Sequence, residues 1–224
     1  MKKPCIVPTV FGLALLAAAL SPSARGGDDW EWWVDLPVSA PLTRGLSLEA
    51  IGSLKFKDDM NYLYNRGITA GPYFRAAPWL CLGFDYWYRE VRRTSSKPWD
   101  EHNTLATRVN LNWKASERLR LQLHNRLEYD ADTYLWRLRL RPRLLIPLVL
   151  GAVPITAVVD DEFFFYLDYP RNRDAFSENR FSVGLRADPT PFIRLQLAYK
   201  RVETRPGDEW TGSNVLATCV KIKI

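Results

Sequence analysis

The sequence feature best suited to chemistry is a set of arginines at every second position. Arg137, Arg139, Arg141 and Arg143 alternate with apolar residues. Side chains two residues apart on a β-strand point to the same side, so the four guanidinium groups would form one basic face. Guanidinium groups bind carboxylate and phosphate oxygens through paired hydrogen bonds. The pattern indicates either an anion-binding wall or one side of an internal salt-bridge network.

The acids on the same face decide between these two interpretations. When the alternation is extended along the chain, it predicts that a set of arginines points inward. They are Arg108, Arg120, Arg126, Arg137, Arg139, Arg141, Arg143, Arg180, Arg186 and Arg194. Arg89 and the lysines at 55, 57, 200, 221 and 223 share this phase, as do fewer acids, at 49, 85, 128, 160, 162 and 178. We expect Glu128, Asp160 and Glu162 to be the acidic partners. Excess positive charge favours an anion path, whereas complete pairing favours a closed interior.

Alternation of apolar and polar residues predicts the elements that carry these side chains. Residues 119–129 read Leu-Arg-Leu-Gln-Leu-His-Asn-Arg-Leu-Glu-Tyr, a period of two that is typical of a half-exposed strand. The same pattern occurs at 30–38, 46–57, 62–74, 79–91, 105–113, 136–144, 155–166, 179–187, 193–201 and 214–224. The sequence therefore predicts an all-β, antiparallel up-and-down fold.

The connections and the apolar faces indicate a transmembrane β-barrel. Polar stretches such as 92–100 and 203–209 alternate with tighter turns such as 75–78 and 114–118. Apolar faces such as Leu138, Leu140 and Leu144 carry no charge, and aromatic residues such as Trp79 and Trp113 gather near strand ends. Long loops at one edge, short turns at the other and aromatic girdles are typical of membrane barrels. A soluble secreted barrel or sandwich is the alternative.

The first 26 residues have the composition of an export signal. Lys2 and Lys3 precede an apolar stretch at 6–20, and small residues at 21–26 offer cleavage sites. We expect a signal peptide at 1–26 and an outer-membrane barrel at 27–224. Losing Lys2, Lys3 and Arg25 lowers the formal net charge of +6, and the remaining modest charge does not indicate nucleic-acid binding.

The strand number is expected to lie between ten and twelve. The pattern yields eleven segments, whereas bacterial single-chain barrels have an even number of strands. Ten strands result if segment 30–38 lies in the lumen, and twelve if one more short strand is present. A barrel of this size has a narrow interior that side chains can largely fill.

Residues for enzymatic or metal chemistry are scarce. His102 and His124 are the two histidines, and neither has a serine or carboxylate at a triad-like spacing. His124 is in phase with inward residues, away from lipid. Cys81 and Cys219 remain after signal removal and show no metal-ligand spacing. We expect no catalytic residues, no metal and no cofactor, and a lipid hydrolase or acyltransferase is the least favoured function.

Several short motifs follow one another in an order found in one bacterial family. They are Trp30 at a strand start, the 57–64 junction, the hairpin joining 71–73 to 79–82, and the segments 125–128, 137–141 and 161–163. With these motifs the chain resembles the outer-membrane barrels known as domain of unknown function 2490. The resemblance implies a barrel and an outer-membrane location and brings no catalytic residues. The C-terminus departs from barrel patterns, because it ends on Ile224 instead of an aromatic residue.

The expected location is the outer membrane of a Gram-negative bacterium. The partners there would be outer-membrane lipids, the barrel-assembly machinery during insertion, and small anions. We expect a narrow pore or binding barrel for small anionic solutes. A structural or envelope-maintenance barrel with a salt-bridged closed lumen is the alternative.

Overall fold

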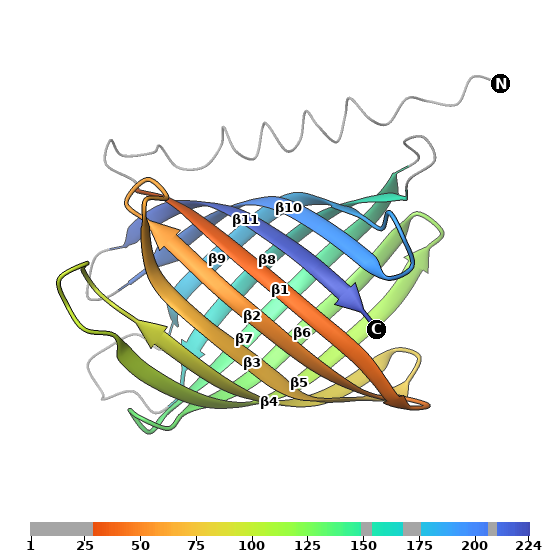
Figure 1. Ribbon diagram of the computed structural model, residues 1–224. Coiled ribbons are helices and arrows are strands. Elements are labelled where there is room, and N and C mark those ends of the chain that lie inside the picture. Colours follow the sequence, from red (N-terminus) through yellow and green to blue (C-terminus); the bar gives the residue numbers. More distant parts are fainter. Residues whose placement is uncertain (1–28, 149–153, 168–175, 206–209) are drawn as a thin grey trace, which may run out of the picture.

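The protein forms a closed barrel of eleven β-strands (Figure 1). The computed structural model describes residues 29–148, 154–167, 176–205 and 210–224. The strands are β1 (Asp29–Thr43), β2 (Leu46–Lys57), β3 (Tyr62–Ala77), β4 (Leu80–Val91), β5 (Asp100–Ser116), β6 (Leu119–Asp130), β7 (Leu135–Leu148), β8 (Ile155–Tyr166), β9 (Phe176–Ala187), β10 (Ile193–Thr204) and β11 (Thr211–Lys223). The expected all-β barrel is confirmed.

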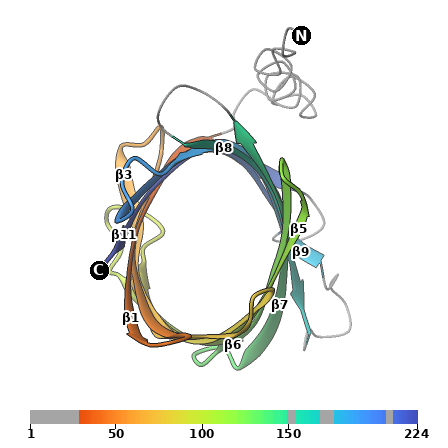
Figure 2. The same ribbon diagram turned by 90° about the vertical axis from the view of Figure 1, so that its right-hand side faces the viewer.

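The barrel closes through a parallel pair between its first and last strands. β1 pairs with β11 in parallel, with Trp30 opposite Asn214 and Val34 opposite Thr218, whereas every other pair of neighbouring strands is antiparallel. A meander with an odd number of strands can close only in this way, because its first and last strands run in the same direction. The count of eleven read from the alternation is therefore correct, and the expectation of an even number is wrong. Figure 2 shows the resulting closed ring.

Alternation along each strand divides the side chains between the outer wall and the lumen. Large apolar residues are exposed on the outer wall, including Leu36 on β1, Ile68 on β3, Leu121 on β6 and Leu197 on β10. The buried residues include many polar and charged side chains, such as Glu162, which is 1 % exposed. This arrangement is the reverse of that in a soluble protein, whose charged residues lie mostly outside.

The two ends of the barrel carry different connections. One end, here called the turn end, has the two-residue turns 44–45, 78–79 and 117–118. The opposite end, here called the loop end, has the connections 58–61, 92–99 and 131–134. Connections 58–61 and 131–134 have four residues each and 92–99 has eight, so these three are longer than the two-residue turns, as the sequence predicts. Residues 149–153, 168–175 and 206–209 lie outside the described residues.

Carboxylates hold the two short connections of the loop end in place. The Asp29 carboxylate accepts hydrogen bonds from the backbone N–H groups of Asp58 and Asp59, at 3.0 and 2.9 Å, and these two residues have left-handed φ angles of 54°. The backbone N–H of Asn103 donates to Asp132 at 2.6 Å, which keeps the pKa of that exposed carboxyl below its usual value. Connections that would otherwise be mobile are thereby fixed to β1 and β5.

Two close strand contacts depend on glycine. A Cβ on Gly71 would lie 1.8 Å from the backbone oxygen of Phe84 on β4. A Cβ on Gly184 would lie 2.4 Å from the backbone oxygen of Leu197 on β10. Only glycine permits backbones to approach this closely.

No segment that the structure describes forms a helix able to span a lipid bilayer. The signal peptide expected at residues 1–26 lies outside the described residues.

Candidate functional site

The four arginines of β7, here called the arginine ladder (Arg137, Arg139, Arg141 and Arg143), point into the lumen and contact carboxylates. Arg137 Nε donates to Glu128 Oε2 on β6 at 2.8 Å. The other three arginines bind acids of β8. For example, Arg139 Nε donates to Glu162 Oε1 at 2.7 Å. Each ladder arginine therefore has a carboxylate partner on a neighbouring strand, although the four arginines share only Glu128, Asp160 and Glu162.

Two buried acids of β8 each serve more than one arginine. Asp160 accepts both Nε and Nη2 of Arg141 at 3.0 Å, Nη2 of Arg143 at 3.3 Å, and the Ser182 hydroxyl at 2.8 Å. Glu162 binds Arg139, lies 3.6 Å from Arg141, and also accepts Arg180 of β9 at 3.4 Å. Each carboxylate thus reduces the repulsion within a cluster of guanidinium groups.

Pro142 leaves the ladder in register. The β7–β8 register is the same on both sides of it, with Leu140 opposite Phe163 and Arg143 opposite Asp160. Direct pairing is missing only across positions 141 and 142, where proline lacks an N–H. Arg143 therefore stays on the lumen side.

Aromatic rings pack between the arginines. Phe164 is 1 % exposed, and the guanidinium carbons of Arg137 and Arg180 lie 4.8 and 4.5 Å from its ring centroid. The guanidinium of Arg126 lies 4.4 Å from the Trp87 ring. Cation–π contacts of this kind favour guanidinium groups that have lost part of their hydration.

A second network, here called the cross-lumen chain (Lys221, Glu49, Arg108 and Asp85), connects strands that are not neighbours. Glu49 of β2 binds Lys221 of β11 and lies 3.5 Å from Arg108 of β5. Arg108 in turn binds Asp85 of β4, with Nη2 2.5 Å from Oδ1. Because β3 and β4 separate β2 from β5 in the ring, the Glu49 and Arg108 side chains must reach across part of the interior.

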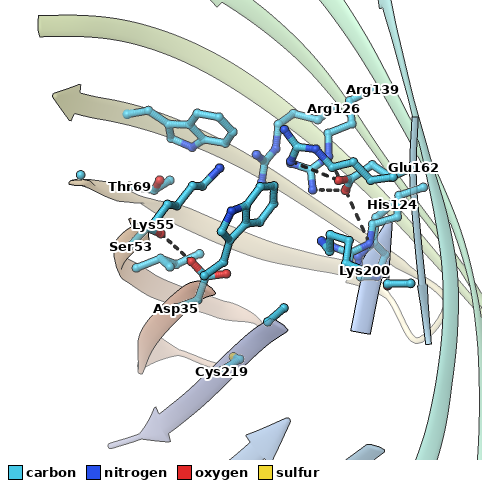
Figure 3. A pocket seen from close by; sticks show the side chains of 18 of the residues that line it. Asp35, Ser53, Lys55, Thr69, His124, Arg126, Arg139, Glu162, Lys200 and Cys219 are labelled. Carbon is cyan, nitrogen blue, oxygen red and sulfur yellow. Dashed lines mark hydrogen bonds and ion pairs between the residues drawn. The ribbon is translucent and has the colours of Figure 1, made fainter. Parts of the chain in front are cut away.

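A central cavity of about 330 Å³ lies between the ladder wall and the β1–β4 wall. Figure 3 shows Asp35, Ser53 and Lys55 on one side of it and His124, Arg139 and Lys200 among those on the other. Glu162 and Asp35 are the acids that line it among the described residues. Glu162 is bound by arginines, and Asp35 accepts the Ser53 hydroxyl at 2.6 Å. The cavity is therefore a mainly basic and polar space.

Three cations at this cavity have no ion-pair partner among the described residues. They are Lys55 of β2, Arg89 of β4 and Lys200 of β10. Lys55 and Lys200 lie on aromatic surface instead, with Nζ 3.8 and 5.2 Å from the Trp33 centroid. The Nε of Arg89 is buried without a hydrogen-bond partner. These three cations therefore differ from the ladder arginines, each of which forms an ion pair.

The remaining predicted arginines separate into two groups. Arg126 lies opposite Arg139 and 3.6 Å from Glu128, so it belongs to the ladder network, as Arg180 does. Arg120, Arg186 and Arg194 lie near the turn end, where Arg120 is exposed. The structure therefore does not bring these three to the ladder.

Sequence reasoning missed two acids. Asp188 lies 2.6 Å from Arg194 and 3.7 Å from Arg186 at the turn end. Asp35 lies in the central cavity. The available signal was that Asp35 has the same strand phase as Trp33. Using this signal would have required placing segment 30–38 in the barrel wall.

The two histidines and the possible metal ligands can be located in the part of the chain that the structure describes. Neither His102 nor His124 hydrogen-bonds to a hydroxyl or carboxylate there. No group of three histidine, cysteine, aspartate or glutamate side chains could hold a metal ion. Cys81 and Cys219 are free thiols.

Comparison with solved structures gives only distant similarity. The siderophore receptor PirA from Pseudomonas aeruginosa is 18 % identical, with a TM-score of 0.29, over 79 % of this chain and 36 % of that chain. The second structure is the ferric enterobactin receptor PfeA of the same organism, in its R480A mutant form in complex with enterobactin. It is 16 % identical, with a TM-score of 0.29, over 79 % of this chain and 38 % of that chain. The aligned part is thus less than half of either receptor.

The family assignment is clear. No curated protein matches the sequence. The family described as protein of unknown function (DUF2490) matches residues 30–210, from the first described strand almost to the last. This match confirms the resemblance seen in the motif order, and the chain belongs to the DUF2490 family.

Proposed function

We propose that the protein is an outer-membrane barrel of a Gram-negative bacterium that binds or passes small anions through its central cavity. An export signal would bring it to the envelope, and the barrel-assembly machinery would insert it among outer-membrane lipids.

The outer wall supports the membrane location. Its exposed apolar side chains surround the barrel, and soluble monomers rarely expose apolar patches beyond a few hundred Å². Trp30 and Trp136 lie toward the loop end, and Phe74 and Trp113 toward the turn end, as in aromatic girdles.

The observation that carries the anion proposal is that Lys55, Arg89 and Lys200 line the cavity without an ion-pair partner among the described residues. Their positive charge, confined in a narrow lumen, favours entry of anions and opposes entry of cations. The arginine ladder contributes less, because its carboxylate partners already occupy its guanidinium groups.

Recording from the purified barrel in a planar bilayer under a potassium chloride gradient tests this proposal. We expect a conductance whose reversal potential has the sign of chloride selectivity. Cation selectivity would refute it.

A closed structural barrel is the second candidate, and the cross-lumen chain favours it. Lys221, Glu49 and Arg108 form ion pairs that connect β11, β2 and β5 across the interior, and the ladder arginines are ion-paired along β7. The same recording distinguishes the candidates, because a closed barrel inserts into the bilayer without a conductance.

A further inference from the structure

The neutral side chains of the central cavity point to a ligand richer in oxygen than a simple anion. Asn65 of β3, Asn110 of β5 and Gln196 of β10 line the cavity. None of these amides makes a side-chain hydrogen bond to another described residue, and Asn65 is only 8 % exposed. Asn65 is buried, whereas Asn110 and Gln196 are partly exposed, so all three side-chain amides are available to a ligand in the cavity.

Unpartnered donors lie beside these amides. Trp87 Nε1 and Arg89 Nε are buried without an acceptor, and both residues line the cavity. Each of these N–H groups therefore lacks an acceptor, which a ligand oxygen in the cavity would supply. An amide can both donate and accept, which is the capacity that a ligand hydroxyl group requires.

Charge and amides act on different parts of a ligand. Lys55, Arg89 and Lys200 would attract a carboxylate or phosphate group. Chloride and acetate accept from the NH2 groups of Asn65, Asn110 and Gln196 but donate nothing to the amide carbonyls, whereas a ligand hydroxyl group can serve both. A cavity of about 330 Å³ is near the lower limit for small-ligand sites, which restricts the ligand to roughly one or two sugar rings.

We infer that the central cavity is a binding site for a small anionic sugar, a carbohydrate that carries a carboxylate or phosphate group. This inference rests on the proposed anion-binding function and names the chemical class of the anion. The cations hold the acidic group, and the three amides hold the hydroxyl groups.

Equilibrium binding to the purified full-length barrel in detergent micelles tests the inference, with sodium glucuronate, sodium acetate and glucose as probes. We expect glucuronate to bind at least about 10-fold more tightly than acetate or glucose, because only glucuronate uses both sets of groups. Asn110→Ala and Gln196→Ala should each weaken glucuronate binding by about 3- to 10-fold and leave acetate binding unchanged. Lys55→Gln should weaken the binding of both anions.

Thr107→Ala is the matched control, because Thr107 is on the same strand as Asn110 but is exposed on the outer wall. It should bind all three probes as the unaltered protein does. Retained heat-dependent migration in electrophoresis shows that each variant is folded. Equal binding of glucuronate and acetate would overturn the sugar inference and leave anion binding intact. Glucose binding as tightly as glucuronate would also overturn it, and absence of binding by either anion would overturn both proposals.

Discussion

Arg108 of β5 and Glu49 of β2 meet across the interior, with Nη1 3.5 Å from Oε2, although two strands separate them in the ring. Glu49 also binds Lys221 of β11, so one carboxylate connects three walls of the barrel. The contact therefore spans part of the lumen, and its Arg108 also lines the central cavity.

Glu49→Gln should widen the lumen at that level. The neutral amide holds Arg108 and Lys221 more weakly, so single-channel conductance should rise while unfolding free energy falls by about 1–3 kcal/mol. Glu117→Gln is the control, because Glu117 lies in an exposed turn and contacts only Lys114 among the described residues. Unchanged conductance in a variant of reduced stability would mean that the chain does not limit the lumen.

Changing Arg139 and Arg141 together to Gln should destabilise the barrel with little effect on selectivity. The change removes two of the cations that bind Glu162 and one that binds Asp160, and breaking buried pairs costs about 3–5 kcal/mol. Urea unfolding in lipid vesicles, followed by tryptophan fluorescence, measures the loss.

Arg66→Gln provides the comparison for that pair of changes, because Arg66 binds Glu90 but is half-exposed. It should change stability by less than about 1 kcal/mol. A folded ladder variant of normal stability and reduced anion selectivity would show that the ladder itself is the anion path.

Leu197→Arg should hinder membrane insertion, whereas Gln196→Arg should be much milder. Leu197 is 53 % exposed on the outer wall near the middle of β10, and its neighbour Gln196 faces the cavity. An arginine on a lipid-facing wall costs about 2–4 kcal/mol near the bilayer midplane. Folding yield into vesicles compares the two variants, and equal yields would contradict the membrane assignment.

Gly71→Ala should impair folding, and Gly52→Ala should not. A Cβ at position 71 would meet the Phe84 backbone oxygen, whereas one at position 52 would meet nothing within 4 Å. Overpacking of this kind costs about 1–3 kcal/mol, and the β3–β4 backbones have little room to separate. The urea midpoints of the two variants measure the difference, and equal midpoints would show that this strand contact is looser than described.

Much of the fold could be predicted from the sequence, because a period of two identifies both the strands and their inner faces. The alternation of β7 predicts the direction of Arg139, and that of β8 predicts its partner Glu162. The parallel closure was not predictable from the rule of even strand numbers. That rule allows segment 30–38 to lie in the lumen instead of the barrel wall. The direction of the Asp35 side chain was therefore not predictable either.

Contacts across the lumen were less predictable than contacts along the wall. Alternation shows that Glu49 and Arg108 both point inward, but their meeting depends on strand tilt, register and the width of the ring. The sequence also does not show which inward cations lack an ion-pair partner. Lys55 and Arg141 have the same inward phase, yet only Arg141 has a carboxylate within reach.

The reversal potential of the Lys55→Gln/Arg89→Gln variant in a planar bilayer tests the central claim most directly. In a potassium chloride gradient, the reversal potential of the unaltered barrel should have the sign of chloride selectivity. The reversal potential of the variant should lie closer to zero, because two cavity cations without ion-pair partners are gone. Lys114→Gln, at an exposed position near the turn end, should keep the original selectivity. A double variant as chloride-selective as the unaltered barrel, or an unaltered barrel selective for potassium, would contradict the account.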